Sequence, residues 1–307
     1  MKTIQFETYG DSSVLQLKQA EKPQPGEGEI LIKIAATTVN PFDMKVRSGS
    51  MQKVIPLNFP WTPGSDAAGT VEAVGSGVSR LKVGDKVFAG SFGGTYAEYV
   101  AVKEENAALI PNNVTLNEAA ALEVPLVTSY SFLVEGADLK QGQRVLIHGA
   151  AGAVGGVMVQ LAKALGAYVI GTASGKGLEL AKSLGADEVI DYKNQDFTQL
   201  VKDVDLVIDL AGGETQAKSF AVVKKGGKLL SAVMPPSQEL AQQYGISAQF
   251  ISSAPSHKKL EFGAKLVEEG KIKTLVAKTF KLEDAGKAQD LVSGGGVNGK
   301  VVIEVGG

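Results

Sequence analysis

The chain has 307 residues, a formal net charge of −2, 44% hydrophobic residues and 21% charged residues. This composition is typical of a globular protein long enough for two domains, and its near-neutral charge gives no general attraction to nucleic acid or anionic lipid. The sequence contains no cysteine and only two histidines, which excludes disulfides, thiolate metal sites and cysteine nucleophiles.

The first part of the chain, to about residue 115, is predicted to be rich in β-structure. Short apolar runs, often alternating with polar residues, are separated by turns that contain Gly and Pro. The predicted strands span residues 30–39, 69–75, 85–90 and 95–102. This pattern favours a small antiparallel barrel over a helical domain.

After about residue 116 the pattern changes to alternating strands and helices. Predicted strands cover residues 144–149, 167–173, 188–192, 205–212 and 227–233, and predicted helices cover 154–165 and 178–185. Such alternation indicates a doubly wound parallel sheet of the Rossmann type. A helix at 262–272 and a strand at 299–305 are predicted to end the chain.

A glycine-rich loop lies between the first strand and the first helix of this second part. It reads Gly149-Ala-Ala-Gly152-Ala153-Val154-Gly155. Small residues at a strand-to-helix turn allow the backbone to approach a pyrophosphate, which then binds the N-terminal amides of the helix. We therefore predict a dinucleotide site here. The alternative is a tight turn that binds nothing.

The end of the second strand selects between the two nicotinamide cofactors. A carboxylate about 20 residues after the loop would bind the ribose 2′-hydroxyl of NAD. This region, Gly171 to Lys176, contains no Asp or Glu, and Ser174 and Lys176 offer a hydroxyl and a cation that suit a 2′-phosphate. The sequence therefore predicts NADPH. The alternative is that both side chains are only solvated in a surface loop.

Six segments together resemble the medium-chain dehydrogenase/reductase superfamily, specifically its zinc-free quinone oxidoreductase and enone (alkenal) reductase branch. They are Asn40-Pro-Phe-Asp43, Pro63-Gly-Ser-Asp-Ala-Ala-Gly69, Gly84-Asp-Lys-Val87, Thr95-Tyr-Ala-Glu-Tyr99, the glycine loop and Gly299-Lys-Val-Val302. The resemblance implies a GroES-like β-barrel catalytic domain at residues 1–121 and 255–307. It implies a Rossmann NADPH-binding domain at residues 122–254.

The resemblance also bears on metal content. The zinc-containing alcohol dehydrogenases carry Gly-His-Glu where this chain has Gly64-Ser65-Asp66. Ser65 replaces the histidine ligand, no cysteine completes the site, and a catalytic zinc needs three protein ligands. We therefore expect no metal. Without a Lewis acid, reduction of electron-poor acceptors is the more accessible chemistry.

Matching motif positions predicts further cofactor contacts. The full predicted set is Lys45, Thr128, Gly149, Gly152, Ala153, Val154, Ser174, Lys176, Tyr192, Ala211, Val233, Phe250 and Lys300. For the apolar members, ordinary core packing is an almost equally good interpretation.

The cofactor supplies the hydride, and the protein supplies the geometry. Hydride transfer to the β-carbon of an unsaturated carbonyl leaves an enolate that needs a hydrogen-bond donor and a proton. Asn40 and Lys45 are the candidate catalytic residues near the carbonyl, with Tyr130 as a weaker candidate donor. The alternative for Lys45 is a surface lysine without a role. His148 and His257 are expected to be packed and solvated, respectively, rather than catalytic.

The sequence thus predicts an NADPH-dependent quinone or enone reductase. Two alternatives stay open: an enoyl-thioester reductase on the same scaffold, and a non-catalytic NADPH-binding protein resembling the lens crystallins recruited from this family. We expect a small-molecule acceptor as substrate and no binding to nucleic acid or membranes. The resemblance implies a homodimer. The N-terminus has no apolar signal core, from which we expect a cytoplasmic location.

Overall fold

The computed structural model describes residues 1–306, which form two compact units. Unit 1 comprises Met1–Val124, Pro255–Glu268 and the chain from Thr274 onward; unit 2 comprises Pro125–Ala254 and Glu269–Lys273. The first boundary therefore falls three residues after the predicted residue 121. The short segment Glu269–Lys273 belongs to unit 2 rather than to the domain predicted from residue 255 onward.

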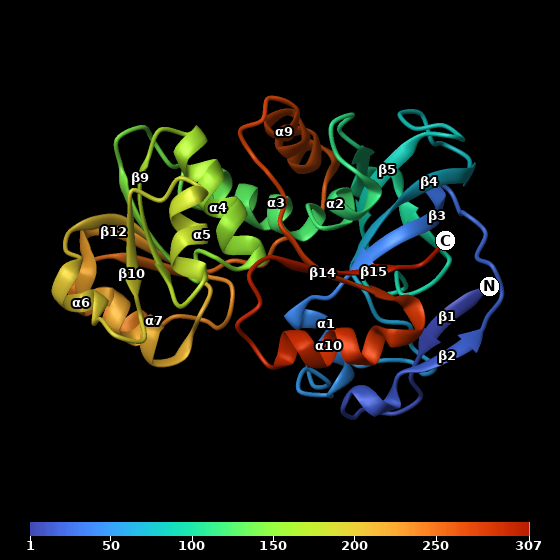
Figure 1. Ribbon diagram of the computed structural model, residues 1–307, viewed down its shortest axis with the longest axis horizontal. Coiled ribbons are helices and arrows are strands. Elements are labelled where there is room, and N and C mark those ends of the chain that lie inside the picture. Colours follow the sequence, from blue (N-terminus) through green and yellow to red (C-terminus); the bar gives the residue numbers. More distant parts are fainter. Residues whose placement is uncertain (307) are drawn as a thin grey trace. The chain divides into compact units, whose positions relative to one another are not determined.

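Unit 1 is built on a seven-stranded sheet with the order β14-β15-β3-β4-β5-β7, in which β6 also pairs with β3 (Figure 1). A separate two-stranded sheet pairs β1 with β2. The strands are β1 (Lys2–Gln5), β2 (Gln16–Gln19), β3 (Glu29–Thr38), β4 (Asp66–Val74), β5 (Lys86–Gly90), β6 (Tyr99–Lys103), β7 (Ala107–Leu109), β14 (Val276–Lys281) and β15 (Lys300–Glu304). All pairings are antiparallel except that of β14 with β15.

Strand β3 is central to unit 1 because β4, β6 and β15 all pair with it. Its isoleucines Ile30, Ile32 and Ile34 are buried in one apolar cluster with side chains from β4, β5 and β6. The predicted strand at 95–102 forms only from Tyr99 onward. The residues before it pair with β1 instead, since the carbonyl of Tyr96 accepts a hydrogen bond from the amide of Ile4.

Short helices complete unit 1. They are α1 (Pro41–Arg47), α2 (Leu116–Ala120), α9 (His257–Glu268) and α10 (Ala285–Ser293), with 3-10 turns at Ser12–Val14, Glu104–Asn106 and Leu282–Asp284. Helix α1 follows β3 directly and α10 precedes β15, so both lie close in sequence to the central strands. The sequence pattern predicted neither α1 nor α10, because helices of seven to nine residues carry little periodic signal.

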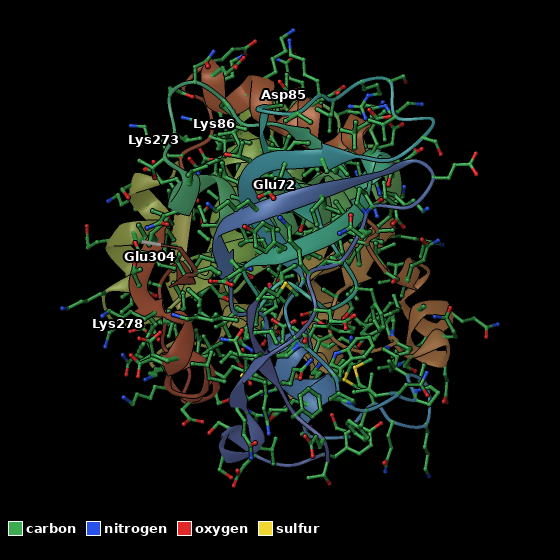
Figure 2. The ribbon with its side chains drawn as sticks, turned by 90° about the vertical axis from the view of Figure 1, so that its right-hand side faces the viewer. Glu72, Asp85, Lys86, Lys273, Lys278 and Glu304 are labelled. Atoms are coloured by element: carbon green, nitrogen blue, oxygen red, sulfur yellow. The ribbon has the colours of Figure 1, made fainter. Side chains whose placement is uncertain are left out.

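Charged side chains of both signs cover the exposed strands of unit 1 (Figure 2). Glu72 on β4 pairs with Lys22, and Lys86 is exposed on β5. On the last strands, Lys278 lies over the ring of Phe280 at 4.9 Å, and Glu304 accepts a hydrogen bond from Asn117. The outer faces of these strands are therefore in contact with water, and the apolar side chains lie inside.

Unit 2 is a six-stranded parallel sheet with the order β10-β9-β8-β11-β12-β13 (Figure 1). The strands are β8 (Arg144–His148), β9 (Tyr168–Ala173), β10 (Glu188–Asp191), β11 (Val204–Asp209), β12 (Val223–Ser231) and β13 (Ser247–Phe250). The helices are α4 (Ala153–Ala164), α5 (Gly177–Ser183), α6 (Phe197–Leu200), α7 (Gly213–Ser219) and α8 (Gln238–Tyr244), with a 3-10 turn at Phe220–Val222. Helix α3 (Glu123–Tyr130) crosses the unit boundary and continues as a π-helix at Ser131–Gly136.

The strand order of unit 2 positions a ligand site. From β8 the chain first builds outward through β9 and β10, and then returns to the other side of β8 to build β11, β12 and β13. The direction of winding therefore reverses next to β8, and open α/β sheets bind ligands beyond the carboxyl ends of the strands at such a reversal. The residues that follow β8 and β11 lie at this edge.

The core of unit 2 explains why its strands are continuous apolar runs. Leu146, Ile170, Val207 and Leu229 come from four neighbouring strands, and all four side chains are fully buried. Helices shield both faces of a doubly wound sheet, so side chains on both faces are apolar. The predicted fold class, a Rossmann sheet joined to a β-barrel catalytic domain, is confirmed. Within residues 1–306, no helix has the length and hydrophobicity of a membrane span.

Candidate functional site

The glycine loop of unit 2 runs from the end of β8 to the start of α4, as predicted from its sequence. Gly149 has a φ of 76°, in the left-handed region that favours glycine. Gly155 lies in the first turn of α4, and a Cβ there would meet the carbonyl oxygen of Gly149 at 2.1 Å. Only a glycine therefore allows the loop to fold back so closely on the helix.

The N-terminus of α4 is open to an anion. Gly152 precedes the helix and provides no side-chain cap, and the first turn contains no acidic residue. The amides of Ala153, Val154 and Gly155 have no partner within the helix, because the first turn of any helix lacks acceptors. Helix N-termini with free amides bind phosphate groups, so a cofactor pyrophosphate fits this end of the sheet.

A buried chain of hydrogen bonds fixes the base of this loop. His148, the last residue of β8, contacts Oγ1 of Thr172 through Nδ1 at 3.1 Å and Oγ of Ser219 through Nε2 at 2.9 Å. Ser219 donates its own hydrogen to the carbonyl of Thr215, so it must accept from His148. The network thus assigns the proton of the neutral ring to Nε2, and Thr172 donates to Nδ1.

The charge state of His148 agrees with this network. The side chain is buried, and burial lowers its pKa to about 4, although Asp209 acts in the opposite direction. The imidazole is therefore neutral at pH 7 and can both donate and accept. Thr172 in turn accepts from the amide of Gly149 at 3.4 Å. His148 is packed, as expected, and it holds the loop in place.

At the carboxyl ends of β9 and β10, the structure brings together two residues predicted to bind the cofactor. Ser174 donates a hydrogen bond from Oγ to the hydroxyl of Tyr192 at 3.0 Å. Lys176 follows two residues later, exposed at the start of α5. Gly175 between them has a φ of 54°, which turns the chain sharply. A hydroxyl pair and a cation thus lie on one exposed loop edge.

The turn after β11 is organised by a buried carboxylate. Asp209 is fully buried and accepts hydrogen bonds from the amides of Ala211 and Gly212 and from the side chains of Gln216 and Ser231. These bonds shape the edge of the sheet where the predicted contacts Ala211 and Val233 lie. Ala211 is exposed and Val233 is half-buried. Sequence reasoning did not identify Asp209, because a single Asp after an apolar run carries no specific signal.

Three other predicted site residues of unit 2 have different surroundings. Phe250 is 46% exposed at the end of the edge strand β13. Thr128 and Tyr130 lie on α3, two residues apart and both half-buried. Residues two positions apart on a helix point in different directions, so these two side chains do not share one face.

Unit 1 contains a buried polar cluster around Asp66, which is fully buried at the start of β4. Oδ2 of Asp66 accepts from Nδ2 of Asn40 at 2.6 Å, and the ammonium group of Lys300 lies 3.5 Å from the same oxygen. Lys300 also donates to Oδ1 of Asn40. In this cluster the ammonium group of Lys300 pairs with the carboxylate of Asp66, and the amide oxygen of Asn40 accepts a hydrogen bond from Lys300.

This cluster locates two predicted site residues, Asn40 and Lys300. Both are buried, with exposures of 5% and 4%. The ammonium group of Lys300 is held by Asn40 and Asp66, and Asn40 keeps one N–H that these contacts do not use. Lys45 is different. It is exposed on α1, and its backbone carbonyl accepts hydrogen bonds from Ser48 and Ser50.

A second buried carboxyl group faces the same cluster. Glu123, at the start of α3, is 2% exposed, and its Oε1 has no hydrogen-bond partner among the described residues. Burial and the neighbouring Asp66 raise the pKa of Glu123 well above its usual range. Both causes favour the protonated form of Glu123, a carboxyl group to which the sequence analysis assigned no role.

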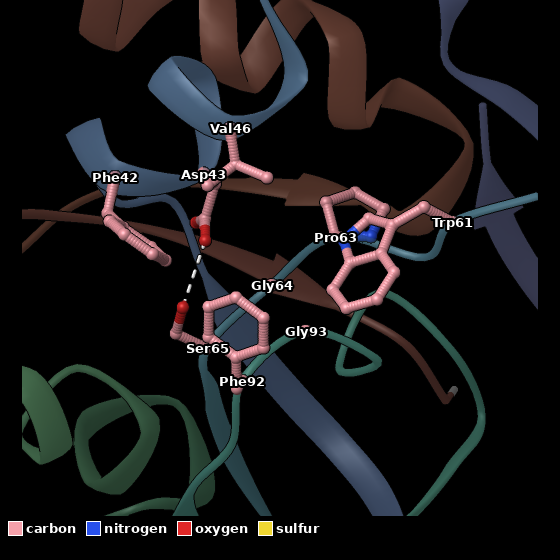
Figure 3. Close-up of a pocket in the computed structure, with 9 residues that line it drawn as sticks. All are labelled: Phe42, Asp43, Val46, Trp61, Pro63, Gly64, Ser65, Phe92 and Gly93. Atoms are coloured by element: carbon pink, nitrogen blue, oxygen red, sulfur yellow. Dashed lines mark hydrogen bonds between the residues drawn. The ribbon is translucent and has the colours of Figure 1, made fainter. Parts of the chain in front are cut away.

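A hollow in unit 1 lies next to α1 (Figure 3). Its lining residues are Phe42, Asp43, Val46, Trp61, Pro63, Gly64, Ser65, Phe92 and Gly93, and its cavity volume of about 10 Å³ gives room for one water-sized group. Oγ of Ser65 lies 3.0 Å from Oδ1 of Asp43, and Oδ2 of Asp43 accepts from the amide of Asn40 at 2.9 Å. Asp43 and Ser65 both lie in segments that resemble the family, but the sequence analysis predicted no role in the site for Asp43.

No group of three or more His, Asp or Glu side chains in residues 1–306 is arranged to hold a metal ion. The two histidines lie far apart in sequence, His148 on β8 of unit 2 and His257 at the start of α9 in unit 1. The hydroxyl of Ser65 is engaged with Asp43. A catalytic zinc site takes three protein ligands from such side chains.

Comparison with known proteins identifies the family. Residues 26–112 match the alcohol dehydrogenase GroES-like domain, and residues 184–303 match a domain described as zinc-binding dehydrogenase. A chloroplastic quinone-oxidoreductase homolog from Spinacia oleracea is 33% identical over 99% of this chain and 98% of its own length. A 2-methylene-furan-3-one reductase from Solanum lycopersicum is 38% identical over 99% of this chain and 79% of its own length.

A solved structure carries the same fold with a cofactor bound. The quinone oxidoreductase of Escherichia coli, solved in complex with NADPH, superposes with a TM-score of 0.90 and 29% identity over 99% of this chain and 100% of its own. Together with the glycine loop, this likeness indicates that a nicotinamide cofactor is used. The chain belongs to the quinone oxidoreductase and enone reductase branch of the medium-chain dehydrogenase/reductase superfamily, and it is an oxidoreductase.

Proposed function

We propose that the protein is an NADPH-dependent reductase that transfers a hydride, without a metal ion, to a quinone or an α,β-unsaturated carbonyl compound. The observation that carries the proposal is the open N-terminus of α4 beside an edge that bears Ser174 and Lys176 and no carboxylate from Gly171 to Lys176. The relatives are named a quinone-oxidoreductase homolog and a furanone reductase, which supports this class of acceptor.

In this proposal each part of unit 2 has a binding task. The amides of Ala153, Val154 and Gly155 hold the pyrophosphate, and His148 with Thr172 fixes the loop that presents them. Lys176 and Ser174 bind the 2′-phosphate, and the hydroxyl of Ser174, which donates to Tyr192 in this structure, turns its hydrogen to the phosphate. When bound, the cofactor supplies the hydride.

The preference for the phosphorylated cofactor rests on charge. A guanidinium or ammonium group attracts a phosphate dianion, and a carboxylate at the same place would repel it. Lys176 is exposed, so its attraction is moderate and depends on salt. The absence of Asp and Glu between Gly171 and Lys176 removes the repulsion. Both effects favour NADPH over NADH.

Metal-free chemistry is supported by the donor set. Ser65 takes the place of the histidine that zinc-containing relatives use, and its hydroxyl contacts Asp43 rather than facing a cluster of ligands. Zinc lowers the pKa of a bound alcohol, so without zinc the oxidation of an alcohol would require a strong base to remove its hydroxyl proton. A conjugated carbonyl is already electron-poor and needs only a hydride, a hydrogen-bond donor and a proton. Reduction of such acceptors is therefore the activity that these residues favour.

Turnover tests the proposal. Purified protein would be mixed with NADPH and a panel of quinones, alkenals, enones and enoyl thioesters, and cofactor consumption followed by absorbance. We expect consumption with quinones or enones and little with enoyl thioesters. If the protein binds NADPH tightly but oxidises none of it with any acceptor, a non-catalytic binding protein is favoured. Consumption only with enoyl thioesters would reassign the substrate class.

We also propose that the protein is a homodimer. Strand β13 (Ser247–Phe250) is an edge strand of the parallel sheet, and its terminal residue Phe250 is 46% exposed. An exposed edge offers unpaired amides and carbonyls to another strand, and a second copy of the same edge can supply them. The edge strand is the support for this proposal.

A further inference from the structure

The hollow beside α1 combines an aromatic wall with one hydroxyl–carboxyl pair (Figure 3). The ring of Phe92 lies 6.0 Å from that of Phe42 and 5.7 Å from that of Trp61. Phe92 is 56% exposed, so this wall faces solvent. Planar conjugated molecules stack on or pack edge-on against aromatic side chains, so an electron-poor acceptor can pack against the exposed ring of Phe92. The hollow itself has room for a water-sized group such as the carbonyl oxygen of that acceptor.

The polar pair in the hollow is unusual because its carboxyl group is buried. Asp43 is 4% exposed, and its two oxygens are held by the hydroxyl of Ser65 and the amide of Asn40. Burial raises the pKa of Asp43 to about 7, with the charge of Asp66 acting in the same direction. Both the protonated and the ionised form of Asp43 are therefore populated near neutral pH.

The charge state of Asp43 sets the direction of its hydrogen bond with Ser65. When Asp43 is ionised, it can only accept, so Ser65 donates its hydrogen inward. When Asp43 carries a proton on Oδ1, it donates to Oγ of Ser65. The hydroxyl hydrogen of Ser65 then no longer bonds to Asp43 and can be donated to another acceptor. Ser65 is half-buried and lines the hollow, so this hydrogen becomes available to a molecule there.

We propose that Ser65 donates a proton to the carbonyl oxygen of an acceptor that packs against the aromatic wall and places this oxygen in the hollow, and that Asp43 then restores the proton to Ser65. This inference rests on the proposed reductase function. It makes Ser65 a catalytic residue that contacts the substrate, and it makes Asp43 a proton store that acts through Ser65. It also supplies the proton that the enolate requires, for which the sequence analysis pointed to solvent or the ribose hydroxyl, with Tyr130 as a weaker candidate donor.

The step balances as follows. The hydride adds to the β-carbon, the C=C electron pair shifts, and the carbonyl π pair becomes a lone pair on oxygen. A new O–H bond forms at that oxygen as the O–H bond of Ser65 breaks, and Ser65 takes the proton of Asp43. Asp43 is left as a carboxylate and regains a proton from water. One hydride and one solvent proton are consumed for each acceptor reduced, and the enol then tautomerises to the ketone in water.

Several ionisable groups face Asp43 and shape its pH dependence. Asp66 on β4 raises the pKa of Asp43, and Lys300 on β15 lowers it. Tyr96, in the segment before β6, is buried nearby, and burial with the charge of Asp43 raises its pKa well above the usual range. Tyr96 is therefore uncharged across the working range. Loss of the proton of Asp43 then gives activity that falls above about pH 7, by about tenfold per pH unit when this step limits the rate.

The test compares kcat/KM for enone reduction across this pH range in the wild type, Ser65→Ala, Ser65→Thr and Asp43→Asn, with Ser79→Ala as an exposed control. We expect Ser65→Ala and Asp43→Asn to lose about 100-fold or more at neutral pH, as is typical when a general acid is removed. In both variants kcat/KM should no longer decrease as the pH rises above about 7. Ser65→Thr keeps a hydroxyl and should retain both the activity and the pH profile, and all variants should bind NADPH with unchanged Kd.

A second arm uses Phe92→Ala, whose side chain is exposed and whose loss should leave the fold intact. If the acceptor packs against this ring, its KM rises severalfold while kcat and the pH profile stay unchanged. A quinone gives a second contrast. Its reduced anion is far less basic than an enolate, so Ser65→Ala should impair quinone reduction less than enone reduction.

The outcomes separate this inference from the proposed function. If the wild type reduces enones, and Ser65→Ala keeps kcat/KM within about twofold with an unchanged pH profile, the proton relay is overturned and the reductase function stands. If the wild type consumes no NADPH with any acceptor, the proposed function itself fails. Should Asp43→Asn not fold, Ser65→Ala and Ser65→Thr decide the question alone, because Ser65 is not fully buried.

Discussion

The ammonium group of Lys300 donates a hydrogen bond to Oδ1 of Asn40, 260 residues earlier in the chain. The same ammonium lies 3.5 Å from Oδ2 of Asp66, which is fully buried. Lys300 thus ties the last strand of unit 1 to the start of α1 and to β4. A buried charge pair of this kind is costly to break from one side, because the remaining charge has no compensation.

Lys300→Met is therefore expected to destabilise the protein by about 3–5 kcal/mol, since it leaves Asp66 without its counter-ion. Urea unfolding followed by circular dichroism measures this loss. Lys278→Met is the matched control, because Lys278 is exposed in the same unit and its removal should change the free energy of unfolding by less than about 0.5 kcal/mol. A loss below about 1 kcal/mol for Lys300→Met would mean that the pair is dispensable.

Gly155→Ala should disrupt cofactor binding through the loop. The added Cβ would lie 2.1 Å from the carbonyl oxygen of Gly149, so the loop must move away from the helix. We expect the Kd for NADPH, measured by fluorescence titration, to rise by about tenfold or more, equivalent to about 1.4 kcal/mol. Gly152→Ala is a milder control because its Cβ would lie 3.3 Å from the same oxygen. Equal effects of both substitutions would contradict this account.

Lys176→Glu should change cofactor selectivity. The substitution removes a cation and adds a carboxylate beside the proposed 2′-phosphate site, so NADPH binding should weaken about tenfold or more while NADH binding changes little. Isothermal titration with both cofactors at low salt measures the difference. Lys182→Glu makes the same charge change elsewhere on α5 and should affect both cofactors equally. An equal loss for both cofactors in Lys176→Glu would remove Lys176 from the phosphate site.

The pH dependence of stability should carry two opposite contributions. Burial depresses the pKa of His148 from 6.5 to about 4, so the unfolded state binds one more proton in this window and stability is lost as pH falls through it. The pKa of Asp43 is raised from 3.8 to about 7, so its stabilisation is present below about pH 4 and is lost as pH rises toward 7. Each group changes the free energy of unfolding by about 1.4 kcal/mol per pH unit.

Urea unfolding of the wild type, His148→Gln and Asp43→Asn between about pH 4.5 and about pH 6.5 separates the two contributions. On acidification, His148→Gln should lose less stability than the wild type, and Asp43→Asn should lose more. Parallel curves for all three proteins would show that neither group titrates as its burial implies.

The edge of unit 2 offers a test of dimerisation. The amide of Ile251 donates to the carbonyl of Ser231 in β12, so the amide of its neighbour Phe250 points away from the sheet. Phe250→Pro removes this outward donor and should shift a dimer to a monomer in light scattering after gel filtration. Phe250→Ala keeps the amide and serves as the control. A wild type that is monomeric at micromolar concentration would reject the dimer, and a dimeric Phe250→Pro would place the interface elsewhere.

Much of unit 2 could be predicted from the sequence, because its signals are local. The apolar runs that became β8, β9 and β10 are short and continuous, and the glycines at 149, 152 and 155 follow a strand and precede a helix, as the structure has them. Steric requirements at a strand-to-helix turn act between neighbouring residues, so a sequence records them directly. The pattern of Ser174 and Lys176 is local in the same sense.

The polar groups of unit 1 could not be predicted in this way. Asn40, Asp66 and Lys300 are adjacent only because β3, β4 and β15 pair in one sheet, and the pKa of Asp43 depends on burial under residues distant in sequence. Asn40 was predicted as a polar group near the acceptor carbonyl and the nicotinamide ribose, and the structure adds that its side-chain amide contacts Lys300 and Asp66. The sequence by itself determined the glycine loop between a strand and a helix on which a dinucleotide site is proposed, and only the tertiary structure decided which carboxyl groups have a raised pKa, because desolvation and charge pairing arise when distant strands come together.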